Sequence, residues 1–313
     1  GLNSFSQKVL LIAGGYDKHI PYDVLGPVVC QKVKKLYLNG ATTALTMFSG
    51  VLSNANADNV TLTRLCNKGD LTLNGTFSGN TRISGLQTDT NMIQTWDSCY
   101  NSGTITVTAE TTISNEFRVG GLLAYTRTAN KTNTLKDCYN TGDIVVEKGA
   151  SFSKIAYIGG LIGHTVNYTP TINGNFYNSG NISVLNAATA TADLLVGGVI
   201  GNAAAKIVDA SCVCDINVAG MIEKASSPAV GVGFIVGNHR GTTAVVGNCK
   251  LSGRLAFTET DGTPNWENYK LGGTFDEDLD SFSEPLWSSK IYGGSWNGSS
   301  ENYDGCSYLA KID

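Results

Sequence analysis

The side chains in this sequence that could support covalent chemistry lie outside any recognised catalytic motif. The three histidines are His19, His164 and His239. No Gly-x-Ser-x-Gly sequence occurs, and no cysteine is matched to a specific histidine as a nucleophile is to its base. His164 holds the place that Asn202 and Asn238 hold after equivalent glycines, so we expect it in an ordinary turn. The sequence therefore predicts no catalytic residue.

Acidic residues form one candidate metal site. Asp276, Asp278 and Asp280 reproduce the first three ligand spacings of a calcium loop. Ser281 stands where that loop needs glycine, and Trp287 where it needs a bidentate glutamate, so a solvated acidic turn is the better interpretation. The carboxylates that stand out elsewhere are Asp143, Glu147 and Asp215, and no pair of them recurs on one face. We expect no metal, no cofactor and no acid–base pair.

A glycine-rich element recurs along the chain. Its best copies read Val-Gly-Gly-Leu-Leu, Ile-Gly-Gly-Leu-Ile and Val-Gly-Gly-Val-Ile, at residues 119–123, 158–162 and 196–200. Its second glycine, or the residue in that place, is Gly50, Gly85, Gly121, Gly160, Gly198 and Phe234. The intervals are 35, 36, 39, 38 and 36 residues, which indicates a repeat protein.

A second element, typified by Cys-Tyr-Asn-x-Gly, follows each copy of the first. Its leading residues are Cys66, Cys99, Cys138, Phe176, Cys212 and Cys249, at intervals of 33 to 39. Because one copy has phenylalanine, we expect this position to be apolar and its cysteines to be a buried column of reduced thiols, with disulfides as the alternative. Cys212 and Cys214 have no second pair and no nearby histidine, so they do not form a zinc motif.

Each repeat is expected to form one coil of a stacked structure. A unit with three short apolar strands and Gly and Asn turns cannot bury its faces alone, so neighbouring units must cover it. The three expected strands are the Gly-Gly strand, the strand entering the Cys-Tyr-Asn turn and the Ile- and Val-rich strand after it. The sequence thus predicts an all-β protein, a parallel β-helix or β-solenoid of about six coils of ~37 residues.

The two elements resemble the GLUG-type repeats of bacterial surface proteins, which pair a V-G-G-L-I-G strand with a C-Y-N-x-G turn. The resemblance covers residues 46 to 257, within an expected solenoid domain of residues 46–259. It implies an adhesin-like stalk or binding surface.

Residues 1–45 do not match the repeat and are expected to form a small β-α-β-like cap. They read as a strand at residues 8–13, a helix opened by Pro21 and a strand at residues 35–38. The runs at residues 11–18 and 38–42 resemble the C-terminal domain of UDP-N-acetylmuramoylalanine–D-glutamate ligase, which implies a nucleotide-site role for Asp17 and Lys18. No Gly-x-x-x-x-Gly-Lys-Ser/Thr phosphate loop occurs, so we favour a cap that covers the first coil.

Residues 260–313 lose the repeat and become rich in aromatic residues. They include three of the four tryptophans: Trp266, Trp287 and Trp296. We expect a cap on the other end of the solenoid, and the alternative is a carbohydrate-binding platform.

Composition limits the classes of partner. The net charge is −4 without a basic stripe, which disfavours nucleic acid, and no apolar run is long enough to cross a membrane. We expect a non-enzymatic, secreted or cell-surface bacterial module that recognises protein or glycan through exposed loops such as residues 126–136 and 187–193. The alternatives are a polysaccharide-active β-helix enzyme and a nucleotide-binding ligase fragment.

Overall fold

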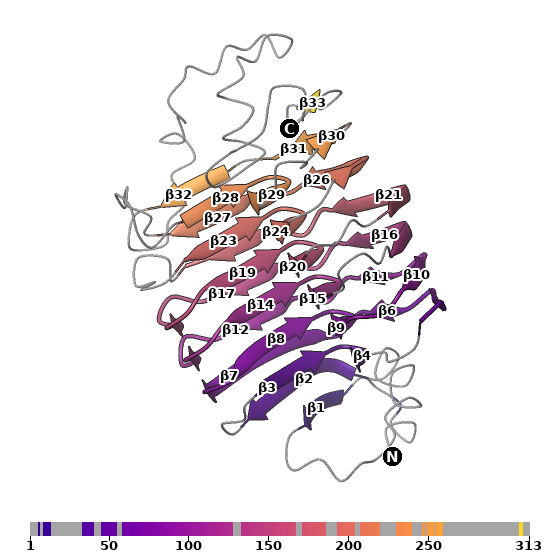
Figure 1. Cartoon of the computed structure of the whole chain (residues 1–313). Helices are drawn as coiled ribbons and strands as arrows, with labels where there is room; N and C mark the ends of the chain where they lie inside the picture. The colour runs from indigo at the N-terminus through magenta and orange to yellow at the C-terminus, as the bar shows by residue number, and fades with distance from the viewer. Residues whose placement is uncertain are drawn as a thin grey trace.

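A computed structural model describes residue 6 and residues 9–13, 33–40, 45–54, 58–127, 133–166, 171–185, 193–203, 207–219, 230–239, 246–247, 249–253, 255–258 and 307–308. Every regular element in these ranges is a β-strand, and every strand pair is parallel. The strands stack into an elongated solenoid with the N-terminal strands at one end and β31 to β33 at the other (Figure 1). The predicted all-β solenoid is confirmed.

Four sheets run along the stack. In spatial order, sheet A holds β1 (Val9–Ala13), β2 (Val33–Gly40), β7 (Asp70–Phe77), β12 (Ile105–Val107), β17 (Ile144–Val146), β22 (Ile182–Val184), β27 (Ile216–Ala219) and β32 (Leu255–Thr258), with β13 (Thr112–Ile113) and β18 (Ser151–Phe152) beside it. Sheet B holds β3 (Leu45–Ser49), β8 (Asn80–Ser84), β14 (Phe117–Gly120), β19 (Ala156–Gly159), β23 (Leu194–Gly197) and β28 (Val230–Gly233).

Sheet C holds β4 (Leu52–Asn54), β9 (Gln87–Thr90), β15 (Leu123–Thr126), β20 (Ile162–Thr165), β24 (Ile200–Ala203) and β29 (Val236–His239). Sheet D holds β5 (Val60–Thr63), β10 (Gln94–Asp97), β16 (Thr134–Asn140), β21 (Thr171–Asn178), β26 (Ala210–Val213), β31 (Lys250–Ser252) and β33 (Ser307–Tyr308), with β6 (Cys66–Asn67) and β11 (Tyr100–Asn101) beside it. A separate pair joins β25 (Ile207–Val208) and β30 (Val246–Gly247).

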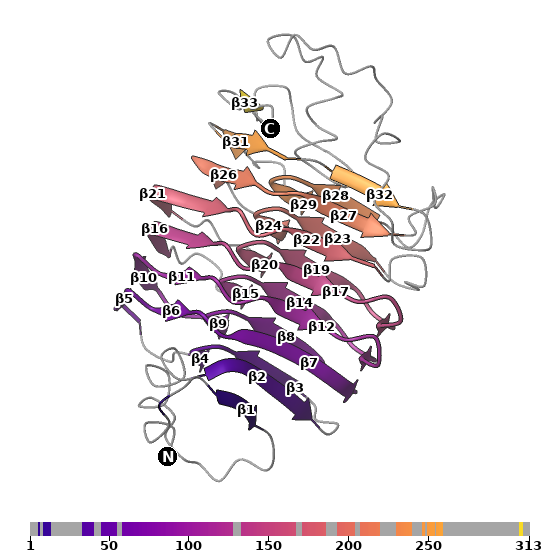
Figure 2. The same ribbon diagram turned by 180° about the vertical axis from the view of Figure 1, so that it is seen from behind.

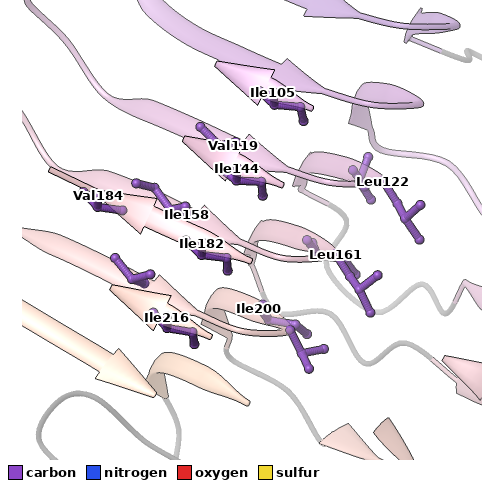
Figure 3. Close-up of a cluster of buried hydrophobic side chains, with 14 of the residues drawn as sticks. Ile105, Val119, Leu122, Ile144, Ile158, Leu161, Ile182, Val184, Ile200 and Ile216 are labelled. Carbon is purple, nitrogen blue, oxygen red and sulfur yellow. The ribbon is translucent and has the colours of Figure 1, made fainter. Parts of the chain in front are cut away.

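Columns of identical apolar residues form the core. Ile105, Ile144, Ile182 and Ile216 are in register in sheet A, and each is fully buried (Figure 3). Strands of sheet A bury every second residue, because successive side chains point to opposite faces of a strand. Stacking therefore repeats one core layer in every coil, and burial of apolar surface supplies the main stabilisation.

The Gly-Gly element forms two strands, not the single strand that we expected. In one coil β14 ends at Gly120 and β15 starts at Leu123, so the glycines make a corner between sheets B and C. A Cβ atom on Gly121 would lie 2.1 Å from the carbonyl oxygen of Gly160 in the next coil. The chain needs glycine here because backbone from the neighbouring coil fills the place of a side chain.

The N-terminal strands extend sheet A. β1 pairs with β2, and β2 pairs with β7 along six residues. Both expected strands of residues 1–45 are present, whereas the expected helix after Pro21 lies outside the described residues. The β1–β2 pair thus occupies the end of the stack where we expected a cap.

Candidate functional site

Most of the residues singled out from the sequence lie outside the described part of the chain. They are Asp17, Lys18, His19, Trp266, Asp276, Asp278, Asp280, Trp287 and Trp296. The same holds for residues 128–132 and 187–192 of the two expected loops, while Thr126 is buried at the end of β15. In the ranges that the structure describes, no group of three or more His, Cys, Asp or Glu side chains could hold a metal ion, and no helix is long and apolar enough to cross a membrane.

The three acidic residues noted in the repeats make contacts between neighbouring coils. The Asp143 carboxylate accepts a hydrogen bond from the Asn181 backbone N–H at 2.8 Å, and the Glu147 carboxylate accepts one from the Ala109 N–H at 2.9 Å. Asp215 donates its own N–H to the Asn181 side chain at 2.9 Å. These contacts join equivalent turns of neighbouring coils, so they are structural.

The asparagine of the Cys-Tyr-Asn turn forms a buried ladder through four coils. The ladder consists of Asn67, Asn101, Asn140 and Asn178. Each of the first three side-chain amides donates a hydrogen bond of 2.7 Å to the amide oxygen in the next coil. Each of the four also donates to the carbonyl oxygen two residues later, at 2.7 to 2.9 Å. The ladder fixes the register of the stack because every amide is used twice.

A column of tyrosines lies next to this ladder on the outer face of sheet D. The rings of Tyr100 and Tyr139 stack at 5.0 Å and 7° between planes, and those of Tyr139 and Tyr177 at 5.1 Å and 6°. The three side chains are partly exposed, and Lys68 lies 5.8 Å from the Tyr100 ring centroid. Burial, followed by the neighbouring Tyr177 and Tyr100, raises the pKa of Tyr139. We call Tyr100, Tyr139 and Tyr177 the tyrosine stack.

Threonines form a second column on sheet D. Thr61, Thr95 and Thr134 are in register across β5, β10 and β16, and Thr171 continues the column in β21. The strands that carry both columns lie above one another along one side of the solenoid (Figure 2). This side therefore carries columns of hydroxyl-bearing side chains with a spacing set by the coil repeat.

Buried charges lie on sheets B and C, and our sequence analysis did not identify them. Arg82 on β8 pairs with Asp89 on β9 at 2.6 Å, and Arg127 pairs with the same carboxylate oxygen at 3.0 Å. The side chain of Asp89 is 0% exposed and that of Arg82 is 5% exposed. Burial lowers the pKa of Arg82, Asp89 raises it, and Arg118 and Arg127 lower it further. The pairing offsets the cost of burying these charges.

The next coils extend this cluster with aromatic rings. Arg118 lies 4.1 Å from the ring centroid of Tyr125 and 5.3 Å from that of Tyr157, and it also pairs with Glu116. Arg118 Nε donates a hydrogen bond to His164 Nδ1 at 3.3 Å, and His164 stacks on Tyr157 with centroids 4.2 Å apart. His164 is 6% exposed and lies within β20, so the expectation of an ordinary turn was wrong.

The members of this cluster contact one another. Arg82 and Arg118 lie 4.7 and 4.1 Å from the Tyr125 ring centroid, so one ring contacts both cations. Arg82 Nε, Asp89 Oδ1 and Arg118 Nη1 are buried without a hydrogen-bond partner among the described residues. An apolar cavity of about 10 Å³, between sheets C and D, is lined by Trp96, Leu122, Leu123, Asn133, Leu135 and Ile162. That volume is close to the minimum for one water molecule.

We expected the cysteines of the repeats to share one column, and the structure shows that they do not. Cys66 pairs with Tyr100, so it lies in the tyrosine column, and Cys212 pairs with Asn178, so it lies in the asparagine column. The first position of the turn is held by Cys99, Cys138 and Phe176. Ala210 pairs with Phe176 and holds this position in the following coil. None of the six cysteines in the described ranges forms a disulfide in the structure, and five are buried.

Comparisons with known proteins find similarity in one short segment. A stretch of 42 residues is 71% identical to UDP-N-acetylmuramoylalanine–D-glutamate ligase of Acetivibrio thermocellus, and covers 13% of this chain and 9% of the ligase. The ligases of Ruminiclostridium cellulolyticum and Clostridium acetobutylicum match at 58% over 41 and 55% over 42 residues, with the same coverage. The chain thus spans about a tenth of the length of these relatives. No known family of domains and no solved structure matches.

Proposed function

We propose that the chain is a non-enzymatic binding module or stalk of a secreted or cell-surface bacterial protein, built of GLUG-type repeats, that recognises a protein or a glycan. The observation that carries the proposal is the tyrosine stack on the outer face of sheet D, with ring centroids 5.0 and 5.1 Å apart. Tyrosine combines a large apolar ring with a hydroxyl that can donate and accept hydrogen bonds, which suits it to recognition surfaces.

The residue types in the outer columns of sheet D favour binding over hydrolysis. Cleavage of a polysaccharide needs two carboxyl groups on either side of the scissile bond. Two columns of this sheet hold threonine and tyrosine. A third column holds Thr63, Asp97 and Lys136, and the side chains of Asp97 and Lys136 contact each other at 3.2 Å. A repeated surface of hydroxyls and ring edges suits an extended partner that makes the same contact in successive coils.

The experiment is binding of the purified chain to an array of glycans and extracellular-matrix proteins. The wild type is compared with Tyr139→Ala, which removes the middle ring of the stack, and with Val145→Ala, which changes a partly exposed residue on sheet A. Loss of binding in Tyr139→Ala alone supports the proposal. Equal binding by all three proteins would show that the binding site lies outside the tyrosine stack. If none of them bound, the recognition role would be wrong and the chain would be a spacer.

A truncation after Phe257 tests the remaining alternative. It removes Trp266, Trp287 and Trp296, for which a carbohydrate-binding platform is the alternative to a C-terminal cap. Binding that this truncation abolishes and Tyr139→Ala preserves would assign recognition to the C-terminal aromatic segment.

The 71% identity to a ligase favours a second candidate, a nucleotide site that includes Asp17 and Lys18. The pairing of β1 and β2 with β7 instead supports a role for this segment as the end of sheet A. Thermal unfolding with millimolar ATP decides between them, because a ligand that binds the folded state raises the unfolding temperature. A rise that Asp17→Ala and Lys18→Ala abolish would support the nucleotide site, and no rise would rule it out.

A further inference from the structure

Two buried thiols at the end of the asparagine ladder lie in contact. The Sγ atoms of Cys212 and Cys214 are 3.3 Å apart, and the residues are 0% and 4% exposed. Both are free thiols in the structure. The contact joins residues two apart in one coil, whereas the amide contacts of the ladder join neighbouring coils.

The shape of the turn brings these two residues together. In the earlier coils the asparagine side chain contacts the residue two positions later, as Asn140 does with the Gly142 carbonyl at 2.7 Å. Cys212 holds the asparagine position because it pairs with Asn178. Asn178 Nδ2 in turn lies 3.4 Å from Cys214 Sγ, so the thiol pair terminates the ladder.

We propose that Cys212 and Cys214 are joined by a disulfide within one coil when the chain folds under oxidising conditions. Each thiol loses one hydrogen as the S–S bond forms. A disulfide oxidant, such as oxidised glutathione, takes the two electrons and two protons and leaves as two thiols. The sulfur atoms need to approach from 3.3 Å to about 2.05 Å.

The disulfide forms before the coil closes. Burial, followed by the neighbouring Cys214, raises the pKa of Cys212 well above its ordinary value, so the folded pair holds little of the reactive thiolate. In the unfolded chain both thiols are accessible and only one residue separates them. Once the coil has packed, the same burial shields the S–S bond from soluble thiols.

Other cysteines give an internal comparison. Cys99 and Cys138 hold equivalent positions in two successive coils, and the presence of each thiol shifts the pKa of the other, which is lowered at Cys99 and raised at Cys138. A bond between them would join positions 39 residues apart in sequence, whereas Cys212 and Cys214 belong to one turn. Cys249 is buried near Cys212 and contributes to the same raised pKa. Cys249 is therefore the other cysteine that could form a disulfide with Cys212, and the experiment must distinguish the two disulfides.

The test uses the full chain, unfolded and reduced, then refolded with a mixture of reduced and oxidised glutathione. Free thiols are blocked, and the protein is digested with trypsin. Cleavage after Lys206 and Lys224 releases both cysteines in one peptide that contains no other cysteine. We expect this peptide to lack two hydrogens and to carry no blocking group, while the peptides with Cys99 and Cys138 are blocked. The variant Cys249→Ala should give the same result.

Two outcomes would overturn the proposal. One is recovery of the 207–224 peptide with both cysteines blocked after refolding with oxidised glutathione. The other is a cross-link from this peptide to Cys249 that is lost in Cys249→Ala. Circular dichroism of the refolded protein shows that the coils have formed. The result does not depend on whether the tyrosine stack binds a partner, so the two proposals fail separately.

Discussion

Asn101 donates a hydrogen bond from its side-chain amide to the amide oxygen of Asn140 at 2.7 Å, although 39 residues separate them in sequence. Asn140 does the same to Asn178, 38 residues further on. The number of residues between successive asparagines varies, yet the hydrogen bonds between their side chains have the same length, so a constant repeat length in sequence cannot explain the ladder. Excess residues are absorbed between the turns, and the turns themselves keep their register.

Replacing Asn140 with alanine should strongly destabilise the solenoid. The change removes one of the two acceptors of the Asn101 amide and the Asn140 donor to the Asn178 oxygen, both in a buried site. We expect a loss of about 2–4 kcal/mol in the free energy of unfolding, measured by urea denaturation.

Thr141→Ala is the matched control, because Thr141 is the exposed next residue of the same turn. It should change stability by less than about 0.5 kcal/mol. If both variants lost the same stability, the turn rather than the ladder would be responsible.

Replacing Gly160 with alanine should also strongly destabilise the solenoid. The new Cβ would lie 2.0 Å from the Gly198 carbonyl oxygen and 2.5 Å from the Asn178 side chain. Backbone cannot move aside as a flexible side chain can, so we expect at least about 3 kcal/mol of destabilisation, the upper part of the usual range for overpacking. Thermal unfolding measures it, with exposed Ser153→Ala as control. A stable Gly160→Ala protein would show that neighbouring corners are less closely packed.

The recurrence of the glycines was predictable because every coil makes the same demand on them, although we expected a single strand there and not a corner. Any residue larger than glycine meets the next coil, so the same letter recurs at Gly50, Gly85, Gly121, Gly160 and Gly198. The cysteine column was assigned wrongly because cysteine suits several buried positions. Cys66 and Cys212 are cysteines like Cys99 and Cys138, but they pair with a different position of the neighbouring turn, and only the backbone pairing shows this.

The buried charges were missed although a signal for them existed. Arg82 and Arg118 hold equivalent places in β8 and β14, each two residues before the corner. Tyr125 pairs with Asp89 on one side and His164 on the other. In the sequence these positions look like unrelated polar residues. Their relation becomes clear only when the Gly-Gly element is divided into one strand of sheet B and one of sheet C, and we had expected a single strand.

Replacing His164 should separate its role as a hydrogen-bond acceptor from its role as a ring. In His164→Leu, Arg118 Nε loses the acceptor that lies 3.3 Å away, and we expect a loss of about 1–3 kcal/mol. His164→Asn keeps a polar acceptor and copies Asn202, the residue paired with it in the next coil, so it should lose less. Urea denaturation compares the two. Equal losses would indicate that stacking on Tyr157 is the main contribution.

The tyrosine stack should be visible in an alkaline titration. Burial and the rings of Tyr177 and Tyr100 raise the pKa of Tyr139 above its ordinary value in the folded protein. The protonated phenol is therefore favoured by folding, and its contribution to stability is complete below about pH 10 and is lost as pH rises through the folded-state pKa. Absorbance at the phenolate band should show a late-ionising component, and Tyr139→Phe should reduce its amplitude. An unchanged late component in Tyr139→Phe would mean that other tyrosines account for it.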